Sequence, residues 1–340
     1  QSPISIMSTI TSPPDSPSRV ATAEARNAPV PDAAPAAERQ RFLGFLGFTA
    51  GLSLVFIQPL VGLIRYALHT PLHSHALLIP FISVYLIWLQ RHTPRPRAGS
   101  SPALAVLPLA VGLVALRAWL FPASPPATWP PNDYLALTTF TYLCLFWSGA
   151  LLLLGGRWLR AHLFATLFLV FLVPLPTAWE NALEVFFQYT SAEAAALLFA
   201  ITGSTVFRTG LTFQLPGITL QVAQECSGIR SSLVLFITSL LAGHMFLRSS
   251  WRRVLLAFVV IPLGIVRNGF RIYVIAWLCV HISPSMIDSI IHRQGGPLFF
   301  ALSLIPFFLL LLGLHWSERG QRRAASARAT AVPPEPGASN

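Results

Sequence analysis

Eight long apolar segments follow one another along the chain and are separated by short polar connections. A membrane-spanning helix needs about 20 consecutive apolar residues, and most of the segments reach that length, although two are short. The pattern therefore predicts an all-α polytopic membrane protein with about eight transmembrane helices. The predicted segments are about 43–64, 75–90, 103–121, 135–155, 161–176, 229–247, 254–280 and 297–315.

Composition supports this fold class and excludes others. Hydrophobic residues make up 54% of the chain and charged residues only 10%, against roughly 25% charged residues in an ordinary soluble domain. A soluble enzyme, a disordered chain and a coiled coil are thereby excluded. The formal net charge is +11, and every basic residue is an arginine. These arginines gather between apolar segments, which indicates membrane topology rather than nucleic-acid binding.

The arginine clusters predict the orientation of the helices. They precede the first segment, follow the last, and occupy alternate connections between the segments. Because arginine-rich loops stay on the cytoplasmic side, both termini are predicted to be cytoplasmic. The loops expected outside are 65–74, 122–134, 177–228 and 281–296. We predict three parts: a disordered cytoplasmic tail at 1–40, a transmembrane domain at 41–316, and a disordered basic cytoplasmic tail at 317–340.

The longest outward connection, 177–228, contains predicted structure of its own. Apolar positions at helical spacing predict a helix over 178–203, lying in the membrane interface or dipping into the bilayer. The following stretch alternates and contains β-branched residues and a Pro-Gly pair. It predicts a short β-hairpin over 205–223.

Cys226 is the first candidate for chemistry. It follows the predicted hairpin and opens the next helix, where the helix dipole and free N–H groups would stabilise a thiolate. The alternative is a buried inert thiol, which is the interpretation favoured for Cys144 and Cys279 because both lie inside apolar segments.

The residues around Cys226 bear on its reactivity. Ser227 and Gly228 would let another backbone approach closely, and Arg230 follows one turn later. Glu225 would oppose thiolate formation if it points the same way.

Two arginines interrupt the seventh apolar segment. Arg267 and Arg271 are four residues apart and share a helix face, with Asn268 close to it. Ionisable groups inside a membrane helix cost several kcal/mol unless they are paired, which makes them functional candidates. A snorkelling arginine or a polar bridge between helices is the structural alternative.

His292 lies just before the last helix, on the same predicted membrane face as Cys226 and Arg271. A solvated loop histidine is the alternative. Cysteine with histidine is the minimal set for thiol catalysis, and arginine can stabilise an oxyanion. A second group, the histidines of HTPLHSH at 69–75, fits no strong metal motif, and a loop or substrate-groove role is expected for it. No cofactor and no metal site are predicted.

Taken together, the motifs ECSGIRSS, NGFR and IHRQGG resemble the exosortase/archaeosortase family over about residues 70–315. The resemblance implies a membrane cysteine endopeptidase or transpeptidase, a thiol protease. It assigns the nucleophile to Cys226, the arginine to Arg271 and the histidine to His292. The residues expected to support catalysis or to bind substrate are Glu225, Ser227, Gly228, Arg230, Arg267 and Asn268.

The resemblance also implies the substrate and its location. The partners would be exported proteins with a C-terminal PEP-CTERM-type sorting signal, which comprises a short motif, a membrane helix and a basic tail. The site would face the periplasm or exterior of a prokaryotic inner membrane, in contact with lipid and without nucleic acid. The alternative from another class is a transporter or an assembly subunit for exported polysaccharide. A lipid-linked transferase ranks last because the outward loops contain few aspartates.

Overall fold

Membrane-spanning helices dominate the structure, a computed structural model that describes residues 33–92, 98–122, 128–223, 227–283, 285–286 and 295–330. In these ranges, six helices are long and apolar enough to cross a membrane, or up to eight if each of two bent pairs counts as one span. The prediction of an all-α polytopic membrane protein is confirmed. The six are η1–α4 (Pro71–Leu77 and Ile79–Leu89), α5 (Pro102–Leu120), α6 (Pro131–Leu153), α10 (Ile229–Phe246), α11 (Ser250–His281) and α13 (Gly296–Thr330).

The first predicted span is two helices rather than one straight helix. Helix α2 (Ala33–Val55) and helix α3 (Ile57–His69) meet at an angle of 75°. Pro59 has no N–H to donate to the carbonyl of Val55, and its ring crowds that carbonyl, so the helix breaks here. Phe56 at the break is 2% exposed and packs against the rings of Trp119 and Tyr142.

The second bend separates the fifth predicted span from the outward helix. Residues Leu163–Leu172, made of α8 (Leu163–Phe168) and η4 (Leu169–Leu172), meet α9 (Thr177–Ile201) at 91°. Pro174 and Pro176 lie in the bend, and Pro176 has the extended backbone of a residue preceding a helix. The short helices α7 (Gly155–Ala161) and η2 (Gln90–His92) complete the helical elements.

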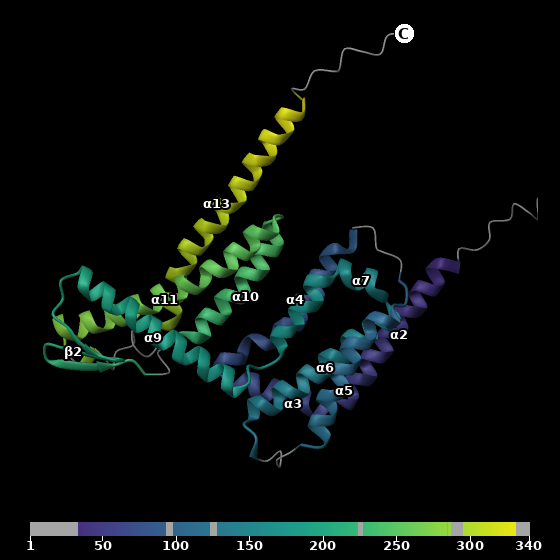
Figure 1. The fold of residues 1–340 in the computed structure, drawn as a ribbon, viewed down its shortest axis with the longest axis horizontal. Helices are drawn as coiled ribbons and strands as arrows, with labels where there is room; N and C mark the ends of the chain where they lie inside the picture. Colours follow the sequence, from purple (N-terminus) through teal and green to yellow (C-terminus); the bar gives the residue numbers. More distant parts are fainter. Residues whose placement is uncertain are drawn as a thin grey trace, which may run out of the picture.

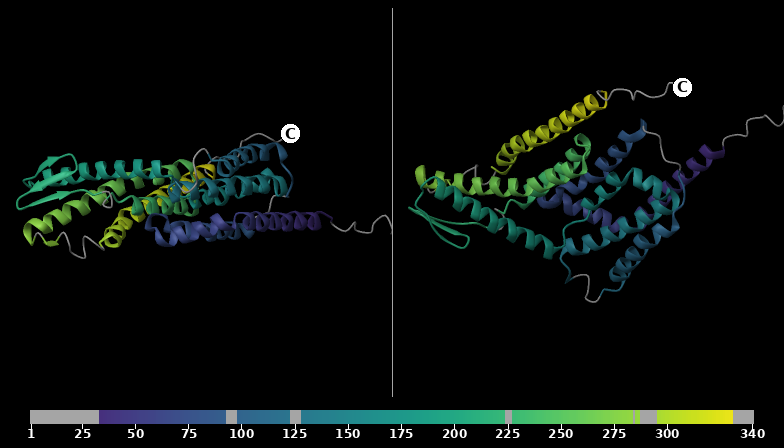
Figure 2. Two further views of the ribbon diagram at one scale, coloured as in Figure 1. Left: turned by 90° about the horizontal axis from the view of Figure 1, so that it is seen from below. Right: turned by 45° about the horizontal axis from the view of Figure 1, so that its top comes forward.

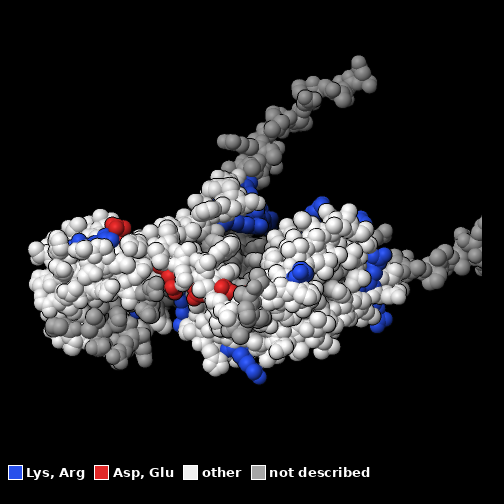
Figure 3. Space-filling model, turned by 60° about the horizontal axis from the view of Figure 1, so that its bottom comes forward, with Lys and Arg blue, Asp and Glu red and all other residues white. Residues whose placement is uncertain are grey.

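The helices form two groups (Figures 1 and 2). In the first, α6 packs against α2, α3 and α5, and in the second, α11 packs against α9, α10 and α13. The segment η1 contacts α3 of the first group, α10 of the second, and α4. Figure 3 shows a surface that is mostly uncharged, with arginines gathered toward parts of its edge, as expected for a protein surrounded by lipid.

A small antiparallel sheet follows α9, where a hairpin was expected. It has three strands in the order β1 (Phe207–Thr209), β2 (Thr212–Leu215) and β3 (Ile218–Gln221). The turn at Pro216-Gly217 joins β2 to β3 as predicted, and the structure adds a third strand to this hairpin. Gly210, with φ +60°, makes a second turn that adds β1.

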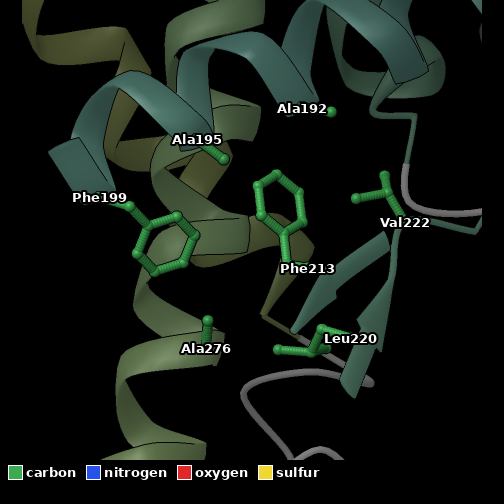
Figure 4. Close-up of a cluster of buried hydrophobic side chains, with 7 residues drawn as sticks. All are labelled: Ala192, Ala195, Phe199, Phe213, Leu220, Val222 and Ala276. Atoms are coloured by element: carbon green, nitrogen blue, oxygen red, sulfur yellow. The ribbon is translucent and has the colours of Figure 1, made fainter. Parts of the chain in front are cut away.

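The sheet, α9 and the second half of α11 enclose a hydrophobic cluster (Figure 4). Its buried members come from all three parts, and α9 approaches α11 closely through small residues. A Cβ atom on Gly269 would lie 2.6 Å from Ala194 Cβ, so only glycine permits this approach. The cluster consists of Ala192, Ala195, Phe199, Phe213, Leu220, Val222 and Ala276.

The first and last helices extend beyond the predicted domain limits. Helix α2 already begins at Ala33, inside the segment predicted as a tail, and α13 continues to Thr330, well past 316. Alanine, which is frequent in both extensions, and arginine, which is frequent in the second, have high helix propensity. A helix that starts in the membrane therefore continues through them.

Candidate active site

Gly228 is the residue that caps helix α10 at its N-terminus. Its backbone is left-handed, with φ +75°, a conformation that glycine adopts without steric cost. A Cβ atom there would lie 2.9 Å from Asn268 Cγ and 3.3 Å from Arg267 Nη2. Both the backbone conformation and the close approach of α11 therefore require glycine at this position.

Arg267 and Asn268 bind two consecutive backbone carbonyls at the start of α10. Asn268 Nδ2 donates a hydrogen bond to the Ser227 carbonyl at 3.1 Å. Arg267 Nη2 donates to the Gly228 carbonyl at 3.2 Å and to Ser232 Oγ at 3.3 Å. Both side chains are buried, at 7% and 2% exposure. Arg267 is thus a polar bridge between α10 and α11 rather than an arginine that snorkels to the surface.

Arg271 lies one turn further along α11 and faces the sheet. It lines a small cavity together with Asn268, Ile272 and Ile275 of the same helix and with residues 220–222 around the end of β3. The cavity offers about 30 Å³ of space for the centres of water molecules, enough to hold an ordered water. Arg271 is half-buried there.

The other two residues of the NGFR motif make further contacts. Gly269 allows the close approach of α9. Phe270 packs edge-on against Phe299 of α13, with ring centroids 6.2 Å apart. The four residues 268–271 therefore contact the start of α10, α9, α13 and the sheet, which explains why one short motif organises this region.

The chain is also fixed on the other side of the candidate nucleophile. The Val222 backbone N–H donates to the Leu211 carbonyl at 3.0 Å, and Gln188 Nε2 of α9 donates to the Val222 carbonyl. Gln188 is 7% exposed. Neither Gln188 nor Ser232 was predicted as part of the site. Only the polarity of Gln188 within an otherwise apolar stretch could have indicated it.

The histidine segment, residues 69–75, packs against the start of α10. His73 is 1% exposed, and its Nε2 accepts a hydrogen bond from the Leu175 N–H at 3.2 Å, which ties η1 to the second bend. The neighbouring Leu72 packs in one buried cluster with Ile229 and Phe187. Among the described residues, no group of three or more His, Cys, Asp and Glu side chains could hold a metal ion.

The structure brings part of the predicted site together. Ser227, Gly228, Arg267 and Asn268 meet where α10 contacts α11, and Arg271 lines the cavity beside Asn268. Arg230 is exposed. Three predicted site residues lie outside the described residues, namely Glu225, Cys226 and His292.

A multi-pass helical membrane protein, with a polar cluster buried where two of its spanning helices meet, is the class that these features define. The family model described as transmembrane exosortase matches residues 67–309, and the chain belongs to this family. The match runs from the end of α3 into α13 and includes every residue of the candidate site. Comparison with curated proteins and with solved structures gave no match.

Proposed function

We propose that the chain is a membrane cysteine endopeptidase or transpeptidase that cleaves the C-terminal sorting signal of exported proteins. The observation that carries this proposal is the attachment of Ser227 and Gly228 to Asn268 and Arg267, one helical turn before Arg271. Consecutive Cα atoms are about 3.8 Å apart. Cys226 directly precedes Ser227 in the sequence.

The proposed reaction uses one residue from each of three motifs. The Cys226 thiolate attacks the scissile carbonyl carbon, a C–S bond forms, and the carbonyl electron pair moves to oxygen. The Arg271 guanidinium stabilises that oxyanion. His292 takes the proton of the Cys226 thiol and, as the C–N bond breaks, gives it to the leaving amine. Water or an amine then attacks the thioester and gives its proton to His292, the C–S bond breaks, and that proton returns to the sulfur, which releases the product and restores the thiol.

The orientation of the helices follows from the arginine clusters, with both termini and the arginine-rich connections cytoplasmic. Arg271 lies 17 residues after Val254, the first residue of α11 beyond Arg252 and Arg253. At 1.5 Å per residue this is about 26 Å, in the outer part of a hydrocarbon core of about 30 Å. In a prokaryotic inner membrane the site would then face the periplasm, next to a peptide bond just outside a substrate's membrane helix.

The transport alternative makes a different demand on the arginines. A transporter would place Arg267 and Arg271 near the midplane to bind an anionic substrate, and Cys226 would be dispensable. The contacts of Arg267 with Gly228 and Ser232 use its guanidinium for holding the helices together. The depth of Arg267 in the membrane and its contacts with Gly228 and Ser232 both favour the peptidase over the transporter.

The test is a reporter protein with a Pro-Glu-Pro motif, a membrane helix and a basic tail, co-expressed with each variant and sized on a gel. Cys226→Ala should abolish processing. Cys144→Ala and Cys279→Ala are matched controls, because both thiols are buried, at 3% and 1% exposure, and both should leave processing intact. Processing that survives in Cys226→Ala would refute the nucleophile assignment.

A further inference from the structure

Strand β3 forms one edge of the small sheet. It pairs with β2 on one side, and the strand order is β1-β2-β3. The Val222 N–H donates to the carbonyl of Leu211, which directly precedes β2. Residue pairs of an antiparallel ladder alternate between hydrogen-bonded and non-hydrogen-bonded pairs. The N–H and C=O groups of Leu220 therefore face β2, whereas those of Thr219 and Gln221 face away from the sheet.

The outward backbone groups of this edge offer donors and acceptors to another chain. No hydrogen bond between described residues uses the N–H or C=O groups of Thr219 and Gln221. The side chains of both residues are exposed. An unpaired row of N–H and C=O groups is a template for the backbone of a further extended segment.

The opposite edge of the sheet is protected by charge. Arg208 stands in the middle of β1, forms an ion pair with Glu193 of α9 at 2.7 Å, and donates from Nε to the Gly210 carbonyl at 2.7 Å. Charged side chains on an edge strand discourage pairing with other chains. Strand β3, with the sequence ITLQ, contains no charged residue and no proline. It is therefore the edge that suits an added strand.

Strand β3 also borders the cavity that Arg271 lines. The end of β3 and the Arg271 face of α11 form the walls of this cavity, and no residue of β1 or β2 takes part. Leu220 and Val222 point toward the helices and fix this end of the strand in the hydrophobic cluster (Figure 4). The cavity holds a group of about the size of a water molecule, which is also the size of a carbonyl oxygen.

We propose that the substrate peptide binds as a fourth strand on the outer edge of β3. This inference rests on the proposed function and names how the extended segment outside a substrate's membrane helix is held. Hydrogen bonds to the backbone of Thr219 and Gln221 supply the affinity. Neighbouring strands lie about 4.8 Å apart, so the added backbone runs beside the cavity and brings a carbonyl oxygen toward Arg271.

Proline substitutions remove the outward donors one at a time. Thr219→Pro and Gln221→Pro each lose an N–H that the sheet itself does not use, and a strand edge accepts proline in this orientation. Thr219→Ala and Gln221→Ala lose the same side chains but keep the N–H.

The comparison within each pair isolates the backbone donor. Processing of the reporter should be about tenfold slower in each proline variant than in the alanine variant of the same position. Unfolding in detergent checks that both members of a pair are folded. Equal processing within both pairs would overturn the proposal.

Photo-cross-linking tests the binding edge without relying on catalysis or on the folding of a proline variant. Benzoylphenylalanine replaces Thr219 in one full-length Cys226→Ala protein and Phe207 of β1, 66% exposed, in another, and each is co-expressed with the reporter. A cross-link to the reporter from position 219 and none from position 207 is the expected result. Equal cross-linking from both positions, cross-linking only within the chain itself, or no cross-link from position 219 would overturn the proposal.

Failure of the proposed function gives a different result. Processing would then survive in Cys226→Ala, or the wild-type chain would leave the reporter intact. In both cases the cross-link from position 219 still decides whether the peptide lies on β3.

Discussion

Replacing Gly228 by alanine tests the geometry of the candidate site most directly. The substitution puts a Cβ atom on a residue with φ +75°, 2.9 Å from Asn268 Cγ and 3.0 Å from its Oδ1. The left-handed backbone alone costs about 1–2 kcal/mol for a residue with a side chain. The overlap additionally forces the start of α10 away from α11.

The size of the effect follows from the bonds that this movement breaks. The Asn268 hydrogen bond to Ser227 contributes about 1 kcal/mol, and the charged Arg267 hydrogen bond to Gly228 about 1.5–3 kcal/mol. With the backbone strain, Gly228→Ala should lower the free energy of unfolding by about 3.5–6 kcal/mol. Reporter processing should fall with it, because the chain next to Cys226 loses its anchor.

Gly210→Ala is the matched control. Gly210 has φ +60°, but a Cβ atom there meets no described heavy atom within 4 Å. This variant therefore measures the backbone strain alone, about 1–2 kcal/mol. Unfolding titrations in detergent and reporter cleavage are compared for the two variants. Equal stability and equal processing would refute the reasoning that close packing against α11 positions the loop.

Three further results are expected. Gly269→Ala should lower the free energy of unfolding, because its Cβ atom would lie 2.6 Å from the Ala194 methyl group of α9. Gly313→Ala on α13 is the control: its Cβ atom meets nothing described within 4 Å, and the same unfolding assay should find it neutral or stabilising. Glu318→Ala should cost about 1–2 kcal/mol, since this buried carboxylate accepts two backbone N–H bonds at the start of α11. Glu193→Ala breaks an exposed ion pair and should lower the free energy of unfolding by at most about 1 kcal/mol. Equal losses of stability in the two glutamate variants would contradict the capping role of Glu318. Arg271→Gln should lower the rate of reporter cleavage by about 10²–10³-fold, and unchanged cleavage would remove Arg271 from the mechanism.

Part of the candidate site was readable from sequence because chemistry and spacing are local properties. The sequence alone contains Cys226 after a predicted hairpin, two arginines inside an apolar segment, and the three motifs in their order. Of the residues that hold the site together, Arg267 and Asn268 were predicted, but Gln188 and Ser232 were not. Gln188 and Ser232 lie 38 residues before Cys226 and six after it, and only packing brings both to the same turn.

The sequence by itself determined that this is a helical membrane protein and where most of its spans lie. Apolar length decides this, because lipid offers no hydrogen bonds and leaves helices as the stable way for such segments to cross. Only the tertiary structure decided the bends at Phe56 and before Thr177, the third strand, and the use of Arg267 as a bridge. Hydropathy sums over about 20 residues and does not register the change of direction that Pro59, or Pro174 and Pro176, introduce within them. The Arg267 bridge depends instead on contacts between segments far apart in the chain.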